Sequence, residues 1–150
     1  MTLIIQRVKS ASVTIDGEKT AEIGKGFMIL FGACNGDTDA DFYAVTEKAV
    51  GLRIMEDENG KMNKSLADVG GSILAVPNFT LAADCRKGKR PSFINAMEPQ
   101  SAKEYFLKFC KECETRGIPT QSGVFGADMK VSICNDGPIT IVLDTDELTK

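Results

Sequence analysis

Two short segments hold the residues of this chain that are best suited to chemistry. Residues 76–84 place Thr80 among small residues directly after an apolar run, and residues 135–140 contain the Gly137-Pro138 step. The chain has no histidine, which excludes a Ser-His-Asp triad, a Cys-His pair and any metal site with a His ligand. Chemistry here must therefore use hydroxyls, backbone amides, carboxylates or a group that the substrate supplies.

Thr80 carries the most prominent hydroxyl of the first segment, and its role has three interpretations. As a nucleophile it would need an adjacent base, which without histidine would be Asp84, a lysine or a terminal amine. As an ordinary strand-end residue it would form local hydrogen bonds only. In the third interpretation, the loop after the strand presents backbone N–H groups that hold a developing oxyanion, and no side-chain nucleophile is needed.

The Gly137-Pro138 step has two interpretations. A Gly-Pro pair most often forms a tight turn between two strands. Alternatively, glycine would let a ligand approach the backbone, and proline would fix the neighbouring carbonyl groups. Fixed carbonyls could bind the ammonium group of a substrate without contacting its side chain.

Composition limits the classes of partner. The chain has 150 residues, 43% of them hydrophobic, and its net charge of −3 argues against general nucleic-acid binding. One basic run remains, which is either a solvated loop or a phosphate contact, and it contains Arg86, Lys87, Lys89 and Arg90. No apolar run is long enough to span a membrane, and the N-terminus is typical of a first strand and not of a signal peptide. We therefore expect a cytoplasmic protein with neither membrane nor DNA as a partner.

The cysteines indicate neither a disulfide framework nor a metal site. There are five of them, an odd number. Cys110 and Cys113 form a C-x-x-C pair late in a predicted helix, whereas a redox pair needs a helix N-terminus. No second pair and no histidine could complete a zinc site. We expect the pair to pack against the core, and we expect no metal and no cofactor.

Strands are predicted where apolar and β-branched residues cluster, at residues 3–8, 11–15, 26–32, 53–55, 72–76, 129–134 and 139–143. The run at 26–32 is apolar throughout and indicates a buried central strand. The run at 72–76 ends at Pro77, which has no N–H group for a strand ladder. Residues 61–66 are expected to be irregular, and the tail at 144–150 is expected to fray.

Two long helices complete the predicted elements. The first follows N-cap candidates at residues 37–39. The second starts at residue 99, where Ser101 and Glu104 form a capping box, and ends near Gly117. Two strands, two strand–helix units and a terminal set of strands therefore follow one another along the chain. This order predicts one compact α/β domain over residues 1–150, with strands in packed sheets and both helices on one side.

Several separated motifs resemble those of the D-aminoacyl-tRNA deacylase family, formerly called D-tyrosyl-tRNA deacylase, in order along nearly the whole chain. The motifs are Gln6-Arg7-Val8, Ala11-Ser12-Val13, Gly60-Lys61-Met62-Asn63, Phe79-Thr80-Leu81-Ala82-Ala83-Asp84, Arg90-Pro91-Ser92-Phe93, Gly126-Ala127-Asp128-Met129 and Asn135-Asp136-Gly137-Pro138-Ile139-Thr140. Phe79-Thr80-Leu81 matches the family's S-Q-F-T-L motif, and Gly137-Pro138 matches its Gly-cisPro motif.

The resemblance implies a homodimer that hydrolyses the ester between a D-amino acid and the 3′ adenosine of tRNA. It also implies activity on glycyl-tRNA, including tRNA-Ala mischarged with glycine. Gly137-Pro138 of one subunit would enter the active site of the other, hold the α-amino group and exclude the L-enantiomer. Arg7 would support this loop.

The family offers two views of the catalytic segment. In one, the residue equivalent to Thr80 is the nucleophile. In the other, the ribose 2′-OH assists the attack of water while backbone amides near Phe79 and Thr80 hold the oxyanion. The absence of histidine fits the second view better, because the substrate then supplies the missing base.

By the same resemblance, further residues belong to the substrate site, namely Asn78, Ala82, Met129 and Thr140. Independently of the resemblance, the position of the basic run at residues 86–90 next to this candidate site favours a phosphate contact with the tRNA. No metal and no cofactor is implied.

Two positions depart from the family pattern. Pro77-Asn78 stands where the family has Ser-Gln, so a hydroxyl and a backbone N–H are lost and the amide side chain is one methylene shorter. Val124 stands where the family often has Arg. Besides a deacylase, the sequence therefore leaves two alternatives. One is a non-catalytic module that binds the tRNA end or another nucleic acid, and the other is a hydrolase of small esters with Thr80 as nucleophile.

Overall fold

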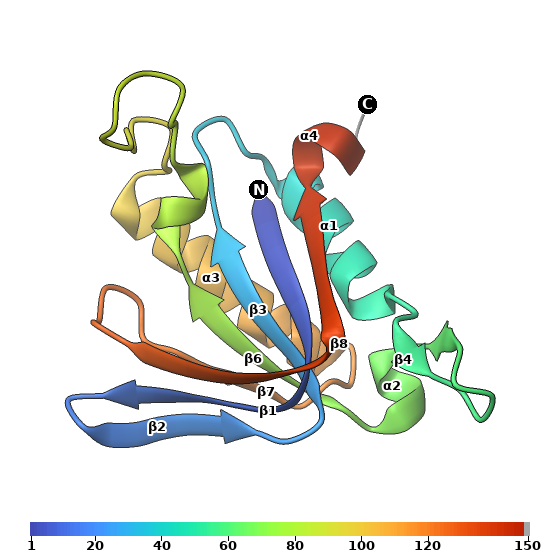
Figure 1. Cartoon of the computed structure of the whole chain (residues 1–150). Coiled ribbons are helices and arrows are strands. Elements are labelled where there is room, and N and C mark those ends of the chain that lie inside the picture. The colour runs from blue at the N-terminus through green and yellow to red at the C-terminus, as the bar shows by residue number, and fades with distance from the viewer. Residues whose placement is uncertain (149–150) are drawn as a thin grey trace.

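A six-stranded sheet forms the centre of the computed structural model, which describes residues 1–148 (Figure 1). The strand order is β2-β1-β3-β6-β7, and β8 pairs with the opposite edge of β1. The pairs within β1, β2, β3 and β8 are antiparallel, whereas β3–β6 and β6–β7 are parallel. The strands are β1 (Thr2–Ile15), β2 (Glu18–Ile23), β3 (Gly26–Gly32), β6 (Ser72–Pro77), β7 (Thr120–Ser122) and β8 (Lys130–Asp144).

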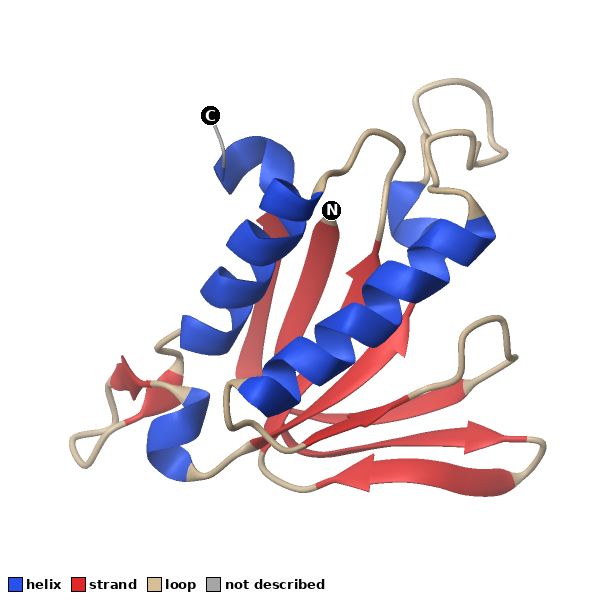
Figure 2. Cartoon of the chain, turned by 180° about the vertical axis from the view of Figure 1, so that it is seen from behind, coloured by secondary structure: helices blue, strands red, loops and turns tan. Residues whose placement is uncertain are grey.

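The two long helices cover one face of the sheet, as predicted (Figure 2). Helix α1 (Asp39–Gly51) lies between β3 and β6 in the chain, and α3 (Pro99–Thr115) lies between β6 and β7. Both helices connect parallel strands, and the right-handed crossover rule brings them to the same face. The main core between helices and sheet contains Phe27, Phe42, Phe106 and Phe109, none of them more than 1% exposed.

Strands β1 and β8 are long enough to belong to both halves of a strongly bent sheet (Figure 1). The sequence predicted two strands in place of each, and this was wrong. Exposed Lys9 and Ser10 interrupt the burial pattern of β1, but the strand continues through them with shifts in its pairing with β8. A second core lies inside the bend and includes Val13, Met28 and Leu74. The two halves of the sheet thus pack on each other.

The N-termini of the helices show where capping was predicted well and where it was not. Thr38 caps α1 in a capping box with Asp41, which confirms one of the predicted candidates. The predicted box of α3 is wrong, because Glu98 is its N-cap and accepts the amides of Gln100 (2.9 Å) and Ser101 (3.0 Å). Proline is favoured in the first helical turn, so Pro99 starts the helix and leaves Ser101 already inside it.

Several short elements differ from the prediction. The segment expected to be irregular contains β5 (Met62–Lys64) and the first residue of α2 (Leu66–Val69), and β5 pairs with β4 (Met55–Glu56). A capping box of Ser65 and Asp68 starts α2. The expected fraying of the tail is wrong for α4 (Thr145–Leu148), since the Thr145 amide bonds to the Met1 carbonyl at 2.9 Å. Residues 149–150 lie outside the described part of the chain.

Candidate active site

The loop after β6 holds the Thr80 segment against β3. The Asn78 amide donates to the Phe31 carbonyl at 2.8 Å, and the 3-10 helix η1 (Phe79–Ala82) begins directly afterwards. A Cβ atom at Gly32 would lie 2.8 Å from Leu81 Cβ, so a side chain there would push η1 away. Local sequence therefore places Phe79 and Thr80 at the carboxyl ends of two adjacent parallel strands.

Asn78 controls both polar groups of Thr80. Its Oδ1 atom accepts the Thr80 amide at 3.2 Å and the Thr80 hydroxyl at 2.5 Å. The hydroxyl proton is thus directed at Asn78, and the oxygen presents its lone pairs elsewhere. Over residues 1–148, Thr80 has no hydrogen bond to a carboxylate or an amine that could take its proton.

Asp84, the carboxylate named as a possible base for Thr80, is engaged by its neighbour. Its two oxygens accept Nε (2.9 Å) and Nη2 (2.7 Å) of Arg86. These bonds lower the pKa of Asp84 to about 2. A carboxylate with so low a pKa is a poor general base. Among residues 1–148, the geometry therefore gives Thr80 no hydrogen-bonded base that could activate it.

A cleft of about 480 Å³ lies beside η1. Two segments far apart in the sequence form most of its lining, the end of β6 with the start of η1, and the turn before β8 with the start of β8, and β3 adds Leu30. The lining residues are Leu30, Val76, Pro77, Asn78, Phe79, Thr80, Gly126, Ala127, Asp128, Met129 and Val131. The cleft combines apolar side chains with exposed backbone, which suits a substrate held by its main-chain groups.

The structure brings together only part of the predicted site. Asn78, Phe79, Thr80 and Met129 line the cleft together. Ala82 is buried beneath them, at 8% exposure, and does not line the cleft. Sequence reasoning gave no role to residues 126–128, although their motif was visible. The available signal was Gly126, whose φ of +82° turns the chain into the cleft wall.

Gly137 and Pro138 lie on a bulge of β8. Gln6 pairs with Thr140 and Val8 pairs with Asn135, so the four residues 136–139 stand opposite Arg7 alone. The Asn135 side chain closes the bulge by accepting the Ile139 amide (2.8 Å) and donating to the Ile139 carbonyl (3.0 Å). The peptide bond between Gly137 and Pro138 is cis, and both residues are exposed.

Arg7 supports this bulge from below, and it is only 4% exposed. Its Nε atom donates to the carbonyl of Asp136 and its Nη1 atom donates to the carbonyl of Ile54, both at 2.9 Å. The guanidinium also lies 3.5 Å from Glu56 and 3.8 Å from Asp136. Gln6 adds a bond from Nε2 to the Thr140 hydroxyl at 3.3 Å. These contacts fix the position of the residue that precedes Gly137.

The cleft and the bulge are separate within one copy of the chain. None of residues 135–140 lines the cleft, and neither does Arg7. The two groups of predicted residues therefore do not form one site inside a single protomer.

The cysteine pair of α3 belongs to the core, as predicted. Burial raises the pKa of the Cys110 thiol to about 11 and that of Cys113 to about 12, so neither is a thiolate at neutral pH. Among residues 1–148, no three His, Cys, Asp or Glu side chains gather in a way that could hold a metal ion. Within the same range, no helix is both long and apolar enough to span a membrane.

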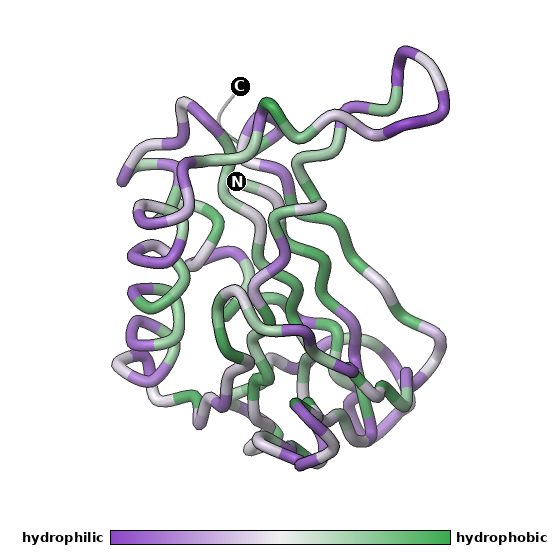
Figure 3. Tube along the Cα trace, turned by 90° about the vertical axis from the view of Figure 1, so that its left-hand side faces the viewer, coloured by the Kyte–Doolittle hydropathy of each residue, from purple (hydrophilic) through white to green (hydrophobic). Residues whose placement is uncertain are grey.

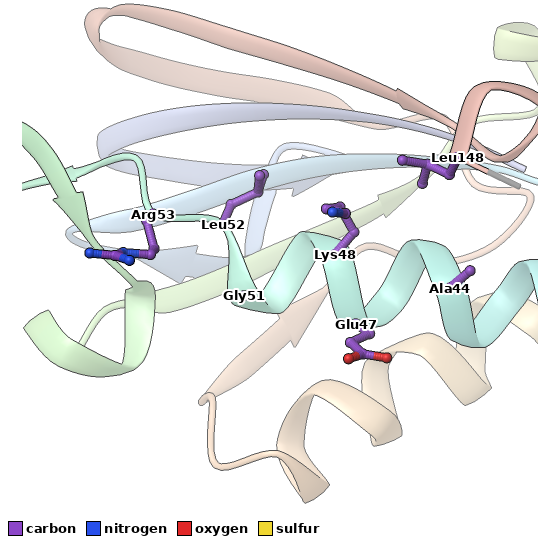
Figure 4. Close-up of a pocket in the computed structure, with 7 residues that line it drawn as sticks. All are labelled: Ala44, Glu47, Lys48, Gly51, Leu52, Arg53 and Leu148. Atoms are coloured by element: carbon purple, nitrogen blue, oxygen red, sulfur yellow. The ribbon is translucent and has the colours of Figure 1, made fainter.

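Another hollow, of about 600 Å³, lies along the C-terminal half of α1, beside α4 (Figure 4). Leu52, Lys48 and Leu148 point toward it, and it contains none of the predicted site residues. We assign no chemistry to it.

Fold and cleft together define a class of protein. The chain is a mixed α/β protein whose candidate site, at the end of a parallel strand, offers hydroxyls and backbone amides and contains no histidine. The family model described as D-Tyr-tRNA(Tyr) deacylase matches residues 4–144. The chain belongs to this deacylase family, which confirms the resemblance seen in the sequence.

Individual relatives agree with the family. The chain is 50% identical over 145 residues to the D-aminoacyl-tRNA deacylase of Clostridium tetani, covering 97% of each chain. It is 52% identical over 144 residues to the D-aminoacyl-tRNA deacylase of Lactobacillus acidophilus, covering 96% of this chain and 99% of the relative. The solved structure of a c-Myc DNA Unwinding Element Binding Protein matches with a TM-score of 0.90 and 39% identity, over 96% of this chain and 98% of that one.

Proposed function

We propose that this protein is a D-aminoacyl-tRNA deacylase, a hydrolase that releases a D-amino acid from the 3′ adenosine of tRNA. Its family and relatives of that name support the class of reaction. The observation that carries the mechanism is the environment of Thr80. Its hydroxyl donates to Asn78, and the nearby carboxylate of Asp84 is held by Arg86. Chemistry at this cleft must therefore rely on backbone amides and on the substrate.

The proposed reaction is hydrolysis of the ester by water. Water adds to the ester carbonyl carbon, and the carbonyl oxygen becomes an oxyanion that the amides of Phe79 and Thr80 stabilise. Amides in the first turn of a helix lack partners within the helix. The Phe79 amide forms no hydrogen bond with residues 1–148, whereas the Thr80 amide must turn from Asn78 Oδ1 toward the oxyanion. The ribose 2′-OH assists removal of the proton from water. The C–O bond to the ribose 3′ oxygen then breaks, that oxygen takes up a proton, and the free amino acid leaves.

Selection of the D-enantiomer is assigned to Gly137 and Pro138 of a second copy of the chain. These residues do not reach the cleft of their own protomer, yet they are exposed and held firmly by Asn135 and Arg7. Backbone carbonyls that hold the α-amino group would read chirality without reading the side chain. This arrangement requires a homodimer with its active sites at the interface, and Thr140 and Ala82 act as supporting residues.

Glycyl-tRNA is proposed as a further substrate, including tRNA-Ala mischarged with glycine. The proposed site excludes L-amino acids because their side chain would collide with Gly137 and Pro138. Glycine has no side chain, so this collision does not occur and glycine is accepted. We place the activity in the cytoplasm, where charged tRNA is used.

The test is hydrolysis of matched D- and L-aminoacyl-tRNA by the purified protein with a chelator present. We expect release of the D-form to exceed that of the L-form by at least about a hundredfold in kcat/KM. Equal rates for both enantiomers would contradict the proposed selectivity, and no release from either would contradict the activity.

Thr80→Ala separates this mechanism from a threonine nucleophile. Substrate-assisted hydrolysis predicts that the variant retains at least about a tenth of the wild-type kcat, since the backbone amide remains. Loss of a true nucleophile would lower kcat by about ten-thousandfold or more. The second outcome would favour the hydrolase with a threonine nucleophile.

A binding module without turnover is the second candidate function. Its support is the 39% identical neighbour, which is named for binding DNA, together with the basic loop at residues 86–90. This second function would be favoured if the protein binds uncharged tRNA or duplex DNA but hydrolyses neither D- nor L-aminoacyl-tRNA.

A further inference from the structure

We propose that Phe79, Phe93 and the loop between Asp84 and Ser92 form a track for the unpaired 3′ nucleotides of tRNA that precede the esterified adenosine. This inference rests on the proposed function, because that function places the adenosine ester in the cleft beside Phe79. We call residues 84–92 the basic hairpin and the two phenylalanines the ring pair.

The ring pair is an aromatic platform at the edge of the cleft. Phe79 lines the cleft and is 56% exposed, and Phe93 is 38% exposed. Their ring centroids are 5.1 Å apart at an interplanar angle of 73°. Unpaired bases stack on exposed aromatic rings with little regard to base identity, so the platform suits the nucleotides next to a bound 3′ end.

The basic hairpin continues directly from this platform. Asp84 and Ser92 close it with two backbone hydrogen bonds of 2.8 and 2.9 Å, and Phe93 is the next residue. Its far end turns at Gly88, with a φ of +70°. The hairpin projects from the body of the protein and is hydrophilic along most of its length (Figures 1 and 3). Platform and hairpin therefore form one continuous surface that leads away from the cleft.

Charge on the hairpin is arranged for an external anion. Arg86 neutralises Asp84 at the base, with contacts of 2.9 and 2.7 Å. Lys87, Lys89 and Arg90 are exposed and form no ion pair with any residue from 1 to 148. These three cations lie within four consecutive positions of a chain whose net charge is −3. Phosphate groups of a nucleic-acid backbone are the ligand that such a group fits.

A single strand fits this surface better than a duplex. The rings need a base that is free to leave its stack, and the bases of duplex DNA are paired and stacked. Phe79 lines the cleft and contacts Phe93, so a strand that ends in the cleft can lie across the ring pair. The single-stranded end of tRNA can place a base on the ring pair, phosphate groups at the basic hairpin and its terminal adenosine ester in the cleft.

The first experiment compares two substrates of different length in the triple variant Lys87→Ala, Lys89→Ala, Arg90→Ala. The substrates are D-aminoacyl-tRNA and the corresponding D-aminoacyl ester of adenosine alone. We expect KM for the tRNA to rise about tenfold or more, and the salt dependence of log kcat/KM to lose a slope of about 2. Hydrolysis of the adenosine ester should be unchanged, because that substrate has no preceding nucleotides.

The matched control is the triple variant Lys25→Ala, Lys61→Ala, Lys111→Ala, which removes the same charge from exposed positions outside the hairpin. It should leave KM for the tRNA within about twofold of wild type. An equal loss in both triple variants would mean that general charge attraction is responsible, and the track would be rejected.

The ring pair is tested by Phe93→Leu, which keeps an apolar contact with Phe79 but removes the ring. We expect KM for the tRNA to rise about fivefold to tenfold, with kcat and the adenosine ester unaffected. Phe93→Tyr retains the ring and should behave as wild type. If Phe93→Leu and the hairpin triple variant both leave KM for the tRNA unchanged, the proposal is overturned.

Failure of the proposed function is distinguishable from failure of the track. If wild-type protein hydrolyses neither ester, the deacylase proposal fails. The track is then tested by fluorescence anisotropy with a CCA-ended RNA oligonucleotide. Tighter binding by wild type than by the hairpin triple variant supports it, whereas equal binding, or preference for duplex DNA of the same length, overturns it.

Discussion

At the scale of single residues, the geometry of Asn78 makes a prediction about the oxyanion. Its Oδ1 atom already accepts the Thr80 amide at 3.2 Å, so any charge placed on this side chain would lie beside a developing oxyanion. Aspartate is as good an N-cap as asparagine, and Asn78→Asp should therefore keep the 3-10 helix and the unfolding midpoint. We expect its kcat to fall by at least about a hundredfold at neutral pH through charge repulsion.

The control for this prediction is Asn78→Ala, which removes the cap without adding charge. It should lower the unfolding free energy by about 1 kcal/mol and reduce kcat less than Asn78→Asp does. Steady-state kinetics and urea unfolding of both variants provide the two measurements. A wild-type kcat in Asn78→Asp would show that no oxyanion forms near Thr80.

The sequence predicted one wall of the cleft and only Met129 of the opposite wall. Thr80 was predicted because a strand ends in polar residues at that point, and the family resemblance added Asn78 and Phe79. The opposite wall comes from the turn at residues 126–128, more than forty positions later in the chain. The order of strands in the sheet decides which turn lies opposite the end of β6. A local sequence pattern does not contain that order.

At the scale of elements, the bulge of β8 predicts that Gly137 is irreplaceable. Its φ is +145°, and a Cβ atom there would lie 2.7 Å from Ile139 Cγ1 and 2.8 Å from the Ile139 nitrogen. Gly137→Ala must therefore displace the bulge that presents Pro138. We expect kcat/KM for D-aminoacyl-tRNA to fall at least about tenfold, or rejection of the L-form to weaken by a similar factor.

Gly60→Ala is the matched control for backbone strain. Gly60 also has a positive φ, +73°, but a Cβ there would meet nothing within 4 Å. Both variants carry the cost of that backbone conformation, and only Gly137→Ala should change turnover or enantiomer selection. Unchanged D-turnover together with unchanged L-rejection in Gly137→Ala would contradict the proposed role of the bulge.

The parallel pair β3–β6 makes a separate prediction about stability. A Cβ atom at Gly26 would lie 1.8 Å from the Ser72 carbonyl oxygen, where β3 and β6 first pair. Gly26→Ala must push the two strands apart, and we expect it to lower the unfolding free energy by about 3 kcal/mol or more. Gly24→Ala, with nothing within 4 Å, should stay within about 0.5 kcal/mol of wild type. Urea unfolding followed by circular dichroism measures both, and equal stability of the two variants would contradict the close strand approach.

Helices and the central strands were predictable because burial and local sequence agree in them. The run of β3 is apolar throughout, and α1 has both its cap and its buried face in the sequence. The short edge strands β2 and β7 were not predicted, since Glu18–Ile23 and Thr120–Ser122 are largely polar and pair only because a neighbour offers an edge. The sequence predicted separate strands on the two sides of the bulge of β8, because the pairing of both with β1 is not visible in local sequence.

At the scale of the whole molecule, the separation of cleft and bulge predicts complementation between two defective subunits. Asn78→Asp impairs the cleft and leaves the bulge intact, whereas Gly137→Ala impairs the bulge and leaves the cleft intact. In a mixed dimer, the cleft of the Gly137→Ala subunit faces the bulge of the Asn78→Asp subunit. That dimer contains one intact site, even though both of its subunits are defective.

Co-expression with two different affinity tags allows the mixed dimer to be purified and assayed against D-aminoacyl-tRNA. We expect about half of the wild-type rate per dimer, because one of two sites is restored. This rate is about fivefold or more above the Gly137→Ala homodimer and still further above the Asn78→Asp homodimer. A dimer carrying both substitutions on the same subunit, with a wild-type partner, is the control. If each site uses the cleft of one subunit and the bulge of the other, both sites of this control dimer are incomplete. The wild-type cleft then meets a defective bulge, and the defective cleft meets the wild-type bulge. A mixed dimer as inactive as its parents, beside a control dimer at half of the wild-type rate, would place each site within one subunit and overturn the cross-subunit arrangement.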